Sequence, residues 1–281
     1  MLVTMKEILD HAKEEGYGVT APNVQSEDTV RAAIETAEKY NAPMIIDVNS
    51  FIHTDLPWFV SMIRSLAEKS PVPIAINLDH GKTYEDMVLG IRSGFTSIMV
   101  DRSSLPYDEN VEQTKEVVKM CSPLGITVEA ELGHVGMGDN YAVDGVNNLT
   151  VPEEAAQFIK DTGIDCLAVA VGTAHGRYTG TPHIDFERLE KIVAACGSTP
   201  LVLHGGSGSG DENLAKAVKI GIQKVNLATD LIVAGKEALE EFIKDPEFDK
   251  WQLIPTFKKG YSEKLGHYIE LFGQAGKAWT K

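Results

Sequence analysis

The chain has 281 residues, 43% of them hydrophobic and 24% charged, a balance typical of a soluble globular protein. Its formal net charge of −15 argues against nucleic acid or an anionic membrane as a partner, because both are bound chiefly through Lys and Arg. The sequence has no run approaching the ~20 apolar residues of a membrane span, and its scattered cysteines suit neither a disulfide framework nor a Cys-based zinc site, so we expect a cytoplasmic protein.

Strand-like and helix-like segments alternate along nearly the whole chain. Residues 1–16 form a charged amphipathic pattern that predicts a helix and differs from a signal peptide. Apolar runs predict strands at residues 17–20, 44–48, 74–80, 97–101, 127–132, 166–172, 201–204 and 224–228. Helical patterns cover residues 26–39, 57–68, 82–92, 109–120, 152–161 and 185–195, begin again near 211 and 230, and end in a helical hairpin expected over 255–278.

Eight strands, each followed by a helix, predict a (β/α)₈ TIM barrel that forms one domain over residues 1–281. A doubly wound sheet is the alternative, although it usually has fewer strands and a switch point. The long Gly-, Asp- and Asn-rich connection at residues 133–150 is typical of a working lid or a disordered insert. Barrel enzymes place their chemistry at the carboxyl ends of the strands. The polar residues found at those ends are Asn23, Asn49, Asp79, His80, Asp101, Glu131, His175, His204 and Asn226.

Three histidines end strands in the same way. His80, His175 and His204 each follow an apolar run and precede a glycine. Neutral imidazole is the commonest zinc ligand, and three protein ligands with one open position define a catalytic zinc site. We therefore expect these histidines to bind Zn²⁺, the alternative being that each only caps its strand. His134, just past the fifth strand, is a reserve candidate.

Carboxylates accompany the histidines at the predicted rim. Glu131, which alternates with Glu129 on one strand, suits either a fourth metal ligand or an ion pair inside the barrel. Asp101 could orient a ligand histidine as a hydrogen-bond acceptor. Asp79 directly precedes a predicted ligand, which suits a proton shuttle to a substrate hydroxyl.

Two glycine-containing loops predict a phosphate site. Residues 205–208 lead from the seventh strand into a helix, and residues 226–230 lead from the eighth strand into another. Free N–H groups and the helix dipole at such loops bind phosphate in many barrels. No lysine ends a strand at the rim, since Lys224 begins the eighth strand, so a Schiff-base mechanism lacks its amine and a metal must polarise the carbonyl.

Five motifs together resemble the class II aldolases that act on fructose or tagatose 1,6-bisphosphate. They are L-D-H-G (78–81), E-A-E-L-G (129–133), G-T-A-H-G-R-Y (172–178), H-G-G-S-G (204–208) and V-N-L-A-T (225–229). The likeness runs from the first strand to F-G-Q-A-G-K at 272–277. It implies reversible retro-aldol cleavage of a ketose (bis)phosphate to dihydroxyacetone phosphate and an aldehyde, in a homodimer or homotetramer.

The resemblance also implies roles for individual residues. Zinc would lie on His80, His175 and His204, with Glu131 and Asp101 in an alternative metal shell. Asp79 would be the acid/base at the C4 hydroxyl, with Asn226 supporting the enediolate. The remaining residues expected at the substrate and its phosphate are Asn23, Asn49, Gly176, Arg177, Gly205, Ser207, Ala228 and Thr229. Backbone carbonyls of these loops would bind a monovalent cation, Na⁺ or K⁺.

The chain departs from the family pattern at several positions. Asp139 stands where the family's long loop has the glutamate that handles the carbon-bound proton, one methylene shorter. Asn77 replaces a frequent histidine, Pro22 a frequent phenylalanine and Thr179 a frequent lysine. Because no arginine for a far phosphate is evident near the predicted C-terminal hairpin, we expect an aldehyde product that differs from glyceraldehyde 3-phosphate.

Two other functions remain open on the sequence alone. A zinc-dependent sugar-phosphate epimerase could use the same barrel, with Asp79 and Asp139 as opposed acids. A catalytically degenerate binding protein would bind zinc and ligand without turnover. A metal-dependent hydrolase is disfavoured, because residues 17–23 lack the H-x-H pair usual on its first strand.

Overall fold

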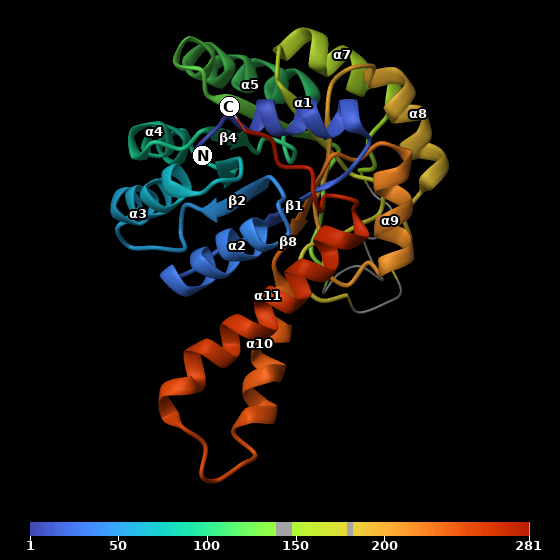
Figure 1. The fold of residues 1–281 in the computed structure, drawn as a ribbon. Coiled ribbons are helices and arrows are strands. Elements are labelled where there is room, and N and C mark those ends of the chain that lie inside the picture. Colours follow the sequence, from blue (N-terminus) through green and yellow to red (C-terminus); the bar gives the residue numbers. More distant parts are fainter. Residues whose placement is uncertain (139–147, 179–181, 281) are drawn as a thin grey trace.

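The chain folds into a nearly closed barrel of parallel strands wrapped by helices (Figure 1). The computed structural model describes residues 1–138, 148–178 and 182–280. Its eight strands form one sheet in the order β1-β8-β7-β6-β5-β4-β3-β2. The two ends of this sheet meet where Val24 N–H donates to the carbonyl oxygen of Asp47 at 3.0 Å. The predicted (β/α)₈ fold class is thus confirmed.

The observed elements follow the predicted order closely. The strands are β1 (Val19–Pro22), β2 (Met44–Asn49), β3 (Ile74–Gly81), β4 (Ser97–Val100), β5 (Thr127–Leu132), β6 (Cys166–Val169), β7 (Leu201–Leu203) and β8 (Lys224–Leu227). The helices are α1 (Met5–Glu15), α2 (Glu27–Lys39), α3 (Leu56–Lys69), α4 (Tyr84–Ser93), α5 (Tyr107–Cys121), α7 (Pro152–Thr162), α8 (Phe186–Cys196), α9 (Asp211–Ile220), α10 (Thr229–Phe242) and α11 (Leu253–Leu271). Short 3₁₀ turns are η1 (Ser122–Leu124) and η3 (Lys250–Gln252). No helix in the described ranges is both long and apolar enough to cross a bilayer.

Local sequence signals set several helix starts. Ser26, the predicted N-cap of α2, accepts a hydrogen bond from the backbone N–H of Thr29. Thr83 caps α4 in the same way, and the side chain of Asp86 in turn accepts from the Thr83 backbone. These reciprocal bonds satisfy N–H groups that a helix start otherwise leaves without partners.

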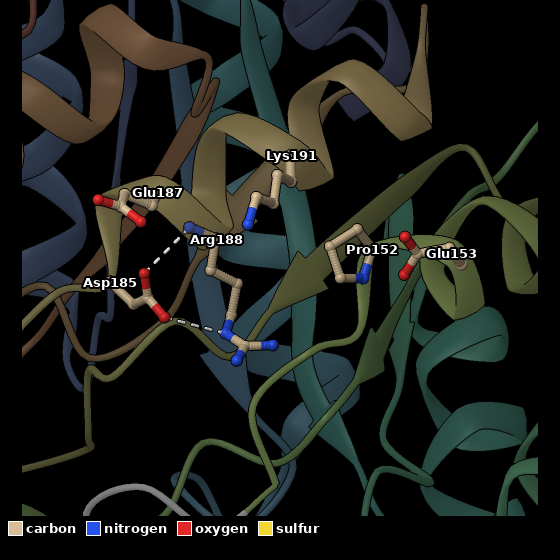
Figure 2. Close-up of a pocket in the computed structure, with 6 residues that line it drawn as sticks. All are labelled: Pro152, Glu153, Asp185, Glu187, Arg188 and Lys191. Carbon is tan, nitrogen blue, oxygen red and sulfur yellow. Dashed lines mark hydrogen bonds and ion pairs between the residues drawn. The ribbon is translucent and has the colours of Figure 1, made fainter.

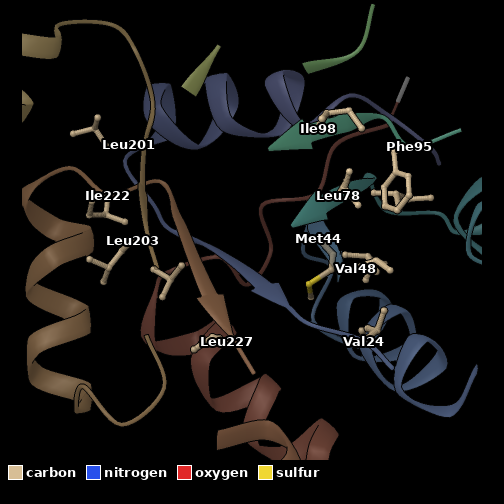
Figure 3. Close-up of a cluster of buried hydrophobic side chains, with 14 of the residues drawn as sticks. Val24, Met44, Val48, Leu78, Phe95, Ile98, Leu201, Leu203, Ile222 and Leu227 are labelled. Carbon is tan, nitrogen blue, oxygen red and sulfur yellow. The ribbon is translucent and has the colours of Figure 1, made fainter. Parts of the chain in front are cut away.

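Two apolar layers hold the barrel. Outside the strands, side chains from strands and helices form a continuous cluster, part of which Figure 3 shows with Met44, Leu78 and Leu203 among its members. Inside, one end of the barrel is filled by small and medium apolar residues such as Ile45, and α1 packs across that end with Met5 and neighbouring side chains. This end of the barrel is therefore closed.

The barrel interior becomes more polar toward the other end. Because side chains alternate along a strand, residues two apart share a face. On β2 the inward series is apolar, then acidic, then amide: Ile45, Asp47 and Asn49. The comparable polar pairs on other strands are Asn77 and Asp79, Glu129 and Glu131, and Lys224 and Asn226. The polar end is the carboxyl end of the strands, where barrel sites lie.

A buried glutamine joins β1 and β2 at the lower part of the seam between them. Gln274, fully buried, accepts hydrogen bonds from the backbone N–H and hydroxyl of Thr20, both at 3.0 Å. Its side-chain amide also donates to the carbonyl oxygen of Pro43. A side chain from the C-terminal segment thus supplies contacts that the two short strands do not make with each other.

The structure differs from the sequence-based expectations in three places. Strand β1 spans Val19–Pro22 and not residues 17–20. The predicted C-terminal helical hairpin is present, but its bounds are not 255–278, because α11 runs as one helix and the hairpin is formed by α10 with α11, extending away from the barrel (Figure 1). Strand β6 ends at Val169 and not at residue 172. The backbone N–H of Ala170 donates instead to the hydroxyl of Thr150, which ends the ladder there.

Candidate active site

A bulge at the end of β3 turns two adjacent side chains toward the barrel mouth. Neighbouring residues of a regular strand point to opposite faces. Here the pairing of β3 with β4 shifts between Leu78 and Gly81, and His80 has a left-handed φ of 54°. Such a conformation is uncommon for a residue other than glycine. Asp79 and His80 consequently both reach the same site, with Asp79 Oδ1 3.8 Å from His80 Nε2.

Three histidines gather at this mouth. His80, His175 and His204 come from β3 and from the segments after β6 and β7. Their ring centroids are 4.7 to 5.6 Å apart, and one nitrogen of each lies within 4.8 Å of one nitrogen of the others. The structure therefore brings the three predicted zinc ligands close enough to share one ion.

Carboxylates set which nitrogens of two rings face the centre. Nδ1 of His80 lies 2.9 Å from Asp101, and Nε2 of His204 lies 2.8 Å from Glu129. Each carboxylate accepts a hydrogen bond from its ring N–H, so a neutral ring carries its lone pair on the opposite nitrogen, His80 Nε2 or His204 Nδ1. These nitrogens face one another at 3.1 Å. Zinc–nitrogen bonds of about 2.0–2.1 Å at tetrahedral angles give a separation of about 3.3 Å, so a cation between the rings fits this donor set.

The electrostatics of the rings are consistent with that fit. Burial together with the neighbouring His204 and His80 rings lowers the pKa of His175 to about 3, so His175 is a neutral donor. Burial disfavours the charged form of His80, but the nearby Asp79 carboxylate and the hydrogen bond to Asp101 outweigh it and raise its pKa to about 9. The carboxylates that favour positive charge at His80 would equally favour a metal cation that takes the place of the proton on Nε2.

Glu131 lies beside this cluster. One ring nitrogen of His80 and one carboxylate oxygen from each of Asp101 and Glu131 lie within 4.8 Å of one another. Glu131 Oε1 accepts from the backbone N–H of Val135 at 2.9 Å, while Oε2 is buried and has no hydrogen-bond partner among the described residues. Burial raises the pKa of Glu131. An unpaired buried carboxylate oxygen costs free energy, and a metal ligand position would explain it.

Asp79 is held by three amide groups. Its Oδ2 accepts from Asn23 at 2.8 Å and from Asn49 at 3.1 Å, and its Oδ1 accepts from Asn226 at 3.1 Å. Burial favours the neutral acid, but the His80 and His204 rings outweigh burial, so the pKa of Asp79 lies below its usual range. Asp79 is therefore an ionised, rigidly oriented carboxylate at the mouth.

A pocket next to the histidines combines loops from both halves of the barrel. Its lining residues are Asn23, Asp79, His175, Gly176, Gly205, Ser207, Asn226, Ala228 and Thr229. Ser207 Oγ accepts from the backbone N–H groups of Ala228 and Asp230, both at 3.2 Å, at the start of α10. A helix N-terminus and a glycine-rich turn that face one small space suit an anion. We call the part of this pocket lined by Gly176, Gly205, Ser207, Ala228 and Thr229 the anion cradle.

Other predicted site residues lie away from the pocket or outside the residues that the structure describes. Arg177 is exposed and is not part of the pocket lining. Asp139 and Thr179 lie outside the described residues. His134 is 2.9 Å from the hydroxyl of Ser103, which in turn donates to Asp101.

Sequence reasoning missed a buried ionic layer under the site. Lys224 is fully buried and pairs with Glu129 at 2.8 Å and Asp47 at 3.4 Å. Asn77 donates to the other oxygen of Asp47 at 2.9 Å. Polar residues two positions before a rim residue on otherwise apolar strands were the available signal, because period 2 directs them inward as well.

A second, surface pocket lies at the starts of α7 and α8 (Figure 2). It is lined by Pro152, Glu153, Asp185, Glu187, Arg188 and Lys191. Arg188 is occupied by Asp185 at 3.1 Å and by the carbonyl oxygen of Thr150 at 3.0 Å. With charges of both signs and its arginine already paired, this pocket offers no comparable site.

Comparisons with known proteins agree with the geometry. A family model described as "Fructose-bisphosphate aldolase class-II" matches residues 3–277. The chain is 39% identical over 306 aligned positions to the fructose-bisphosphate aldolase of Thermus caldophilus, covering 99% of this chain and all of that protein. The crystal structure of the YdjI aldolase from Escherichia coli K12 is similar with a TM-score of 0.88 at 34% identity, over 99% of this chain and 100% of that one. A putative fructose-1,6-bisphosphate aldolase from Coccidioides immitis matches with a TM-score of 0.86 at 28% identity, over 97% of each chain. The resemblance noted in the sequence is thus confirmed, and the chain belongs to the class II fructose-bisphosphate aldolase family, as an aldolase of the carbon–carbon lyases.

Proposed function

We propose that this aldolase is zinc-dependent and reversibly cleaves a ketose phosphate to dihydroxyacetone phosphate and an aldehyde. The observation that carries the proposal is the meeting of His80, His175 and His204 beside an anion cradle. The name of the Thermus caldophilus relative supports a sugar bisphosphate as the substrate class. The absence of a far-phosphate arginine from the sequence pattern favours a different aldehyde half.

His80, His175 and His204 would hold the zinc ion, with Asp101 and Glu131 as the alternative shell. When bound, zinc supplies a Lewis acid that polarises the ketose carbonyl. The residues around it need only position the ketose and move protons.

Asp79 acts as the base in the cleavage direction. It removes the proton of the C4 hydroxyl, the oxygen electrons form the aldehyde carbonyl, and the C3–C4 bond breaks. The bonding electrons stay on C3 of the three-carbon half. Asn226, which already contacts Asp79 at 3.1 Å, supports the negative charge that develops there. Protonation of C3 completes the cycle, and Asp139 is our candidate donor.

The phosphate of the three-carbon half binds in the cradle. Gly176, Gly205, Ser207, Ala228 and Thr229 line it, and the backbone N–H of Thr229, between the two N–H groups that Ser207 binds at the start of α10, would meet the phosphate oxygens. Asn23 and Asn49 would act beside the cradle, where their side-chain amides donate to Asp79 and hold the base in place. Arg177, on the exposed rim, is our candidate for the outer part of the substrate. The backbone carbonyls of these loops would also bind a monovalent cation, Na⁺ or K⁺.

Exposed apolar side chains at the turn of the α10–α11 hairpin support a homodimer or homotetramer. Trp251 is 77% exposed and Ile254 56% exposed where the hairpin turns. Large apolar side chains exposed together mark contact surfaces.

A cytoplasmic location is supported by the cysteines. The three cysteines are free and buried, which suits a reducing compartment such as the cytoplasm.

Zinc quantification coupled to triose-phosphate release tests the function. We expect near-stoichiometric zinc, triose-phosphate formation from ketose phosphates, loss of turnover with a chelator and its recovery on adding zinc. The His175→Ala variant, with one proposed ligand removed, should lose both metal and turnover. Formation of an epimeric ketose without triose phosphate would favour the epimerase, and tight zinc and ligand binding without any turnover would favour the binding protein.

A further inference from the structure

A buried chain of polar contacts crosses the barrel below the histidines. It runs from Asn77 to Asp47 (2.9 Å), from Asp47 to Lys224 (3.4 Å), from Lys224 to Glu129 (2.8 Å) and from Glu129 to His204 (2.8 Å). All five side chains are inaccessible to solvent. This series of contacts therefore joins β3, β2, β8 and β5 to His204, the residue that follows β7.

Such a layer is not needed for stability alone. Removing a charge from water costs several kcal/mol even when it is paired, and apolar residues of similar volume are often as stable. The apolar layer beside α1 shows that this barrel can fill its interior without charges. A function for the ionic layer is best sought at the end that touches the site, which is the contact between Glu129 and His204.

The two oxygens of Glu129 have separate partners. Oε2 accepts from the Lys224 ammonium and Oε1 faces Nε2 of His204. A carboxylate that pairs with an ammonium group at 2.8 Å only accepts hydrogen bonds, so the contact of Oε1 with His204 places the ring proton on Nε2.

We propose that Glu129 and Lys224 are positioning residues that hold His204 in the tautomer whose Nδ1 lone pair faces the metal. Lys224 holds the Oε2 atom of Glu129 in place, and the Oε1 atom of Glu129 fixes the His204 ring. His80 is fixed by Asp101 through its opposite nitrogen. The inference rests on the proposed zinc site of His80, His175 and His204.

The Glu129→Gln substitution tests the tautomer directly. The carboxamide oxygen will face the Lys224 cation, so its NH₂ group will point at Nε2 of His204. That nitrogen must then accept, the ring proton moves to Nδ1, and the metal position is blocked. We expect zinc affinity, measured at equilibrium against a competing chelator, to fall about 10–100-fold, the range found when such supporting hydrogen bonds are removed.

A double variant separates orientation from packing. In Glu129→Gln with Lys224→Met, the cation no longer attracts the carboxamide oxygen, which can turn to His204 and accept from Nε2. We expect most of the lost zinc affinity to return, although stability falls further. A purely structural role predicts the opposite, a larger loss in the double variant.

Asp47→Asn is the matched control, because it also removes one carboxylate partner of Lys224 but does not touch His204. We expect lower thermal stability and unchanged zinc affinity. An equal loss of affinity in Asp47→Asn and Glu129→Gln, or no loss in Glu129→Gln, would overturn the inference.

A measurement on the unaltered protein covers the case in which a variant does not fold. In ¹⁵N-labelled zinc-loaded protein, the ring of His204 should carry its proton on Nε2, and protonation on Nδ1 would refute the tautomer. If the unaltered protein binds no zinc, the proposed function fails. If it binds zinc tightly and Glu129→Gln binds it equally well, only the positioning role fails.

Discussion

Asn49 and Asp79 are paired in register across β2 and β3, and the Asn49 side-chain amide donates to Asp79 Oδ2 at 3.1 Å. The same amide reaches the Asp79 backbone carbonyl at 3.2 Å. Asn49 is thus placed to orient the Asp79 carboxylate.

We expect Asn49→Ala to lower kcat about tenfold while KM changes little, because a misaligned base loses transition-state stabilisation. Steady-state kinetics with the best ketose phosphate, together with zinc content, measures this. A raised KM at unchanged kcat would instead identify Asn49 as a substrate-binding residue.

Asp79→Asn separates proton transfer from metal binding. The amide has nearly the same shape as the carboxylate but cannot take up the C4 hydroxyl proton. We expect kcat to fall by about 10²–10⁴-fold, the usual contribution of a positioned acid/base, with zinc content retained. Loss of zinc in this variant would mean that Asp79 helps to form the metal site.

Gly205 tests the anion cradle. Its φ is +68°, and a Cβ there would lie 2.3 Å from the carbonyl oxygen of Ala174, in the segment that leads to His175. We expect Gly205→Ala to displace this segment and to reduce kcat/KM for a ketose phosphate at least tenfold, because the cradle and a ligand histidine move together.

Gly210→Ala is the matched control. Gly210 lies in the same loop with φ +85°, but a Cβ there meets nothing within 4 Å. We expect Gly210→Ala to lower stability by a similar amount, because alanine is strained at this positive φ, and to leave the kinetics near normal. Equal kinetic losses in the two variants would assign the effect to backbone strain in the loop and not to the cradle.

The elements and the meeting of three histidines follow from the sequence, because buried strands and amphipathic helices have different periods and the strand ends of a barrel converge. The joint orientation of Asp79 and His80 does not follow, since it depends on a bulge and on a positive φ at His80. The partner of Lys224 does not follow either, although its place two residues before Asn226 directs its side chain inward. Its place at the start of β8 indicated the far end of the barrel, but its buried side chain reaches Glu129 in the interior at 2.8 Å.

Gln274→Ala tests the seam between β1 and β2. The substitution leaves the Thr20 N–H and the Pro43 carbonyl without their partner in a buried place. Each unsatisfied group costs about 1–3 kcal/mol, so we expect unfolding free energy to fall by about 2–4 kcal/mol in denaturant titrations. Gln157→Ala, which removes only an exposed contact to Asp161, should change stability by less than about 0.5 kcal/mol. Equal losses in the two variants would contradict the role of Gln274.

The dependence of the β1–β2 seam on Gln274 also orders events during translation. Both strands leave the ribosome more than two hundred residues before the side chain that links them, since Thr20 and Gln274 are 254 positions apart. A nascent chain can assemble helices and neighbouring strand pairs early, but this link forms only after residue 274 has emerged. The growing chain therefore carries an open edge through most of its synthesis, a form that chaperones recognise.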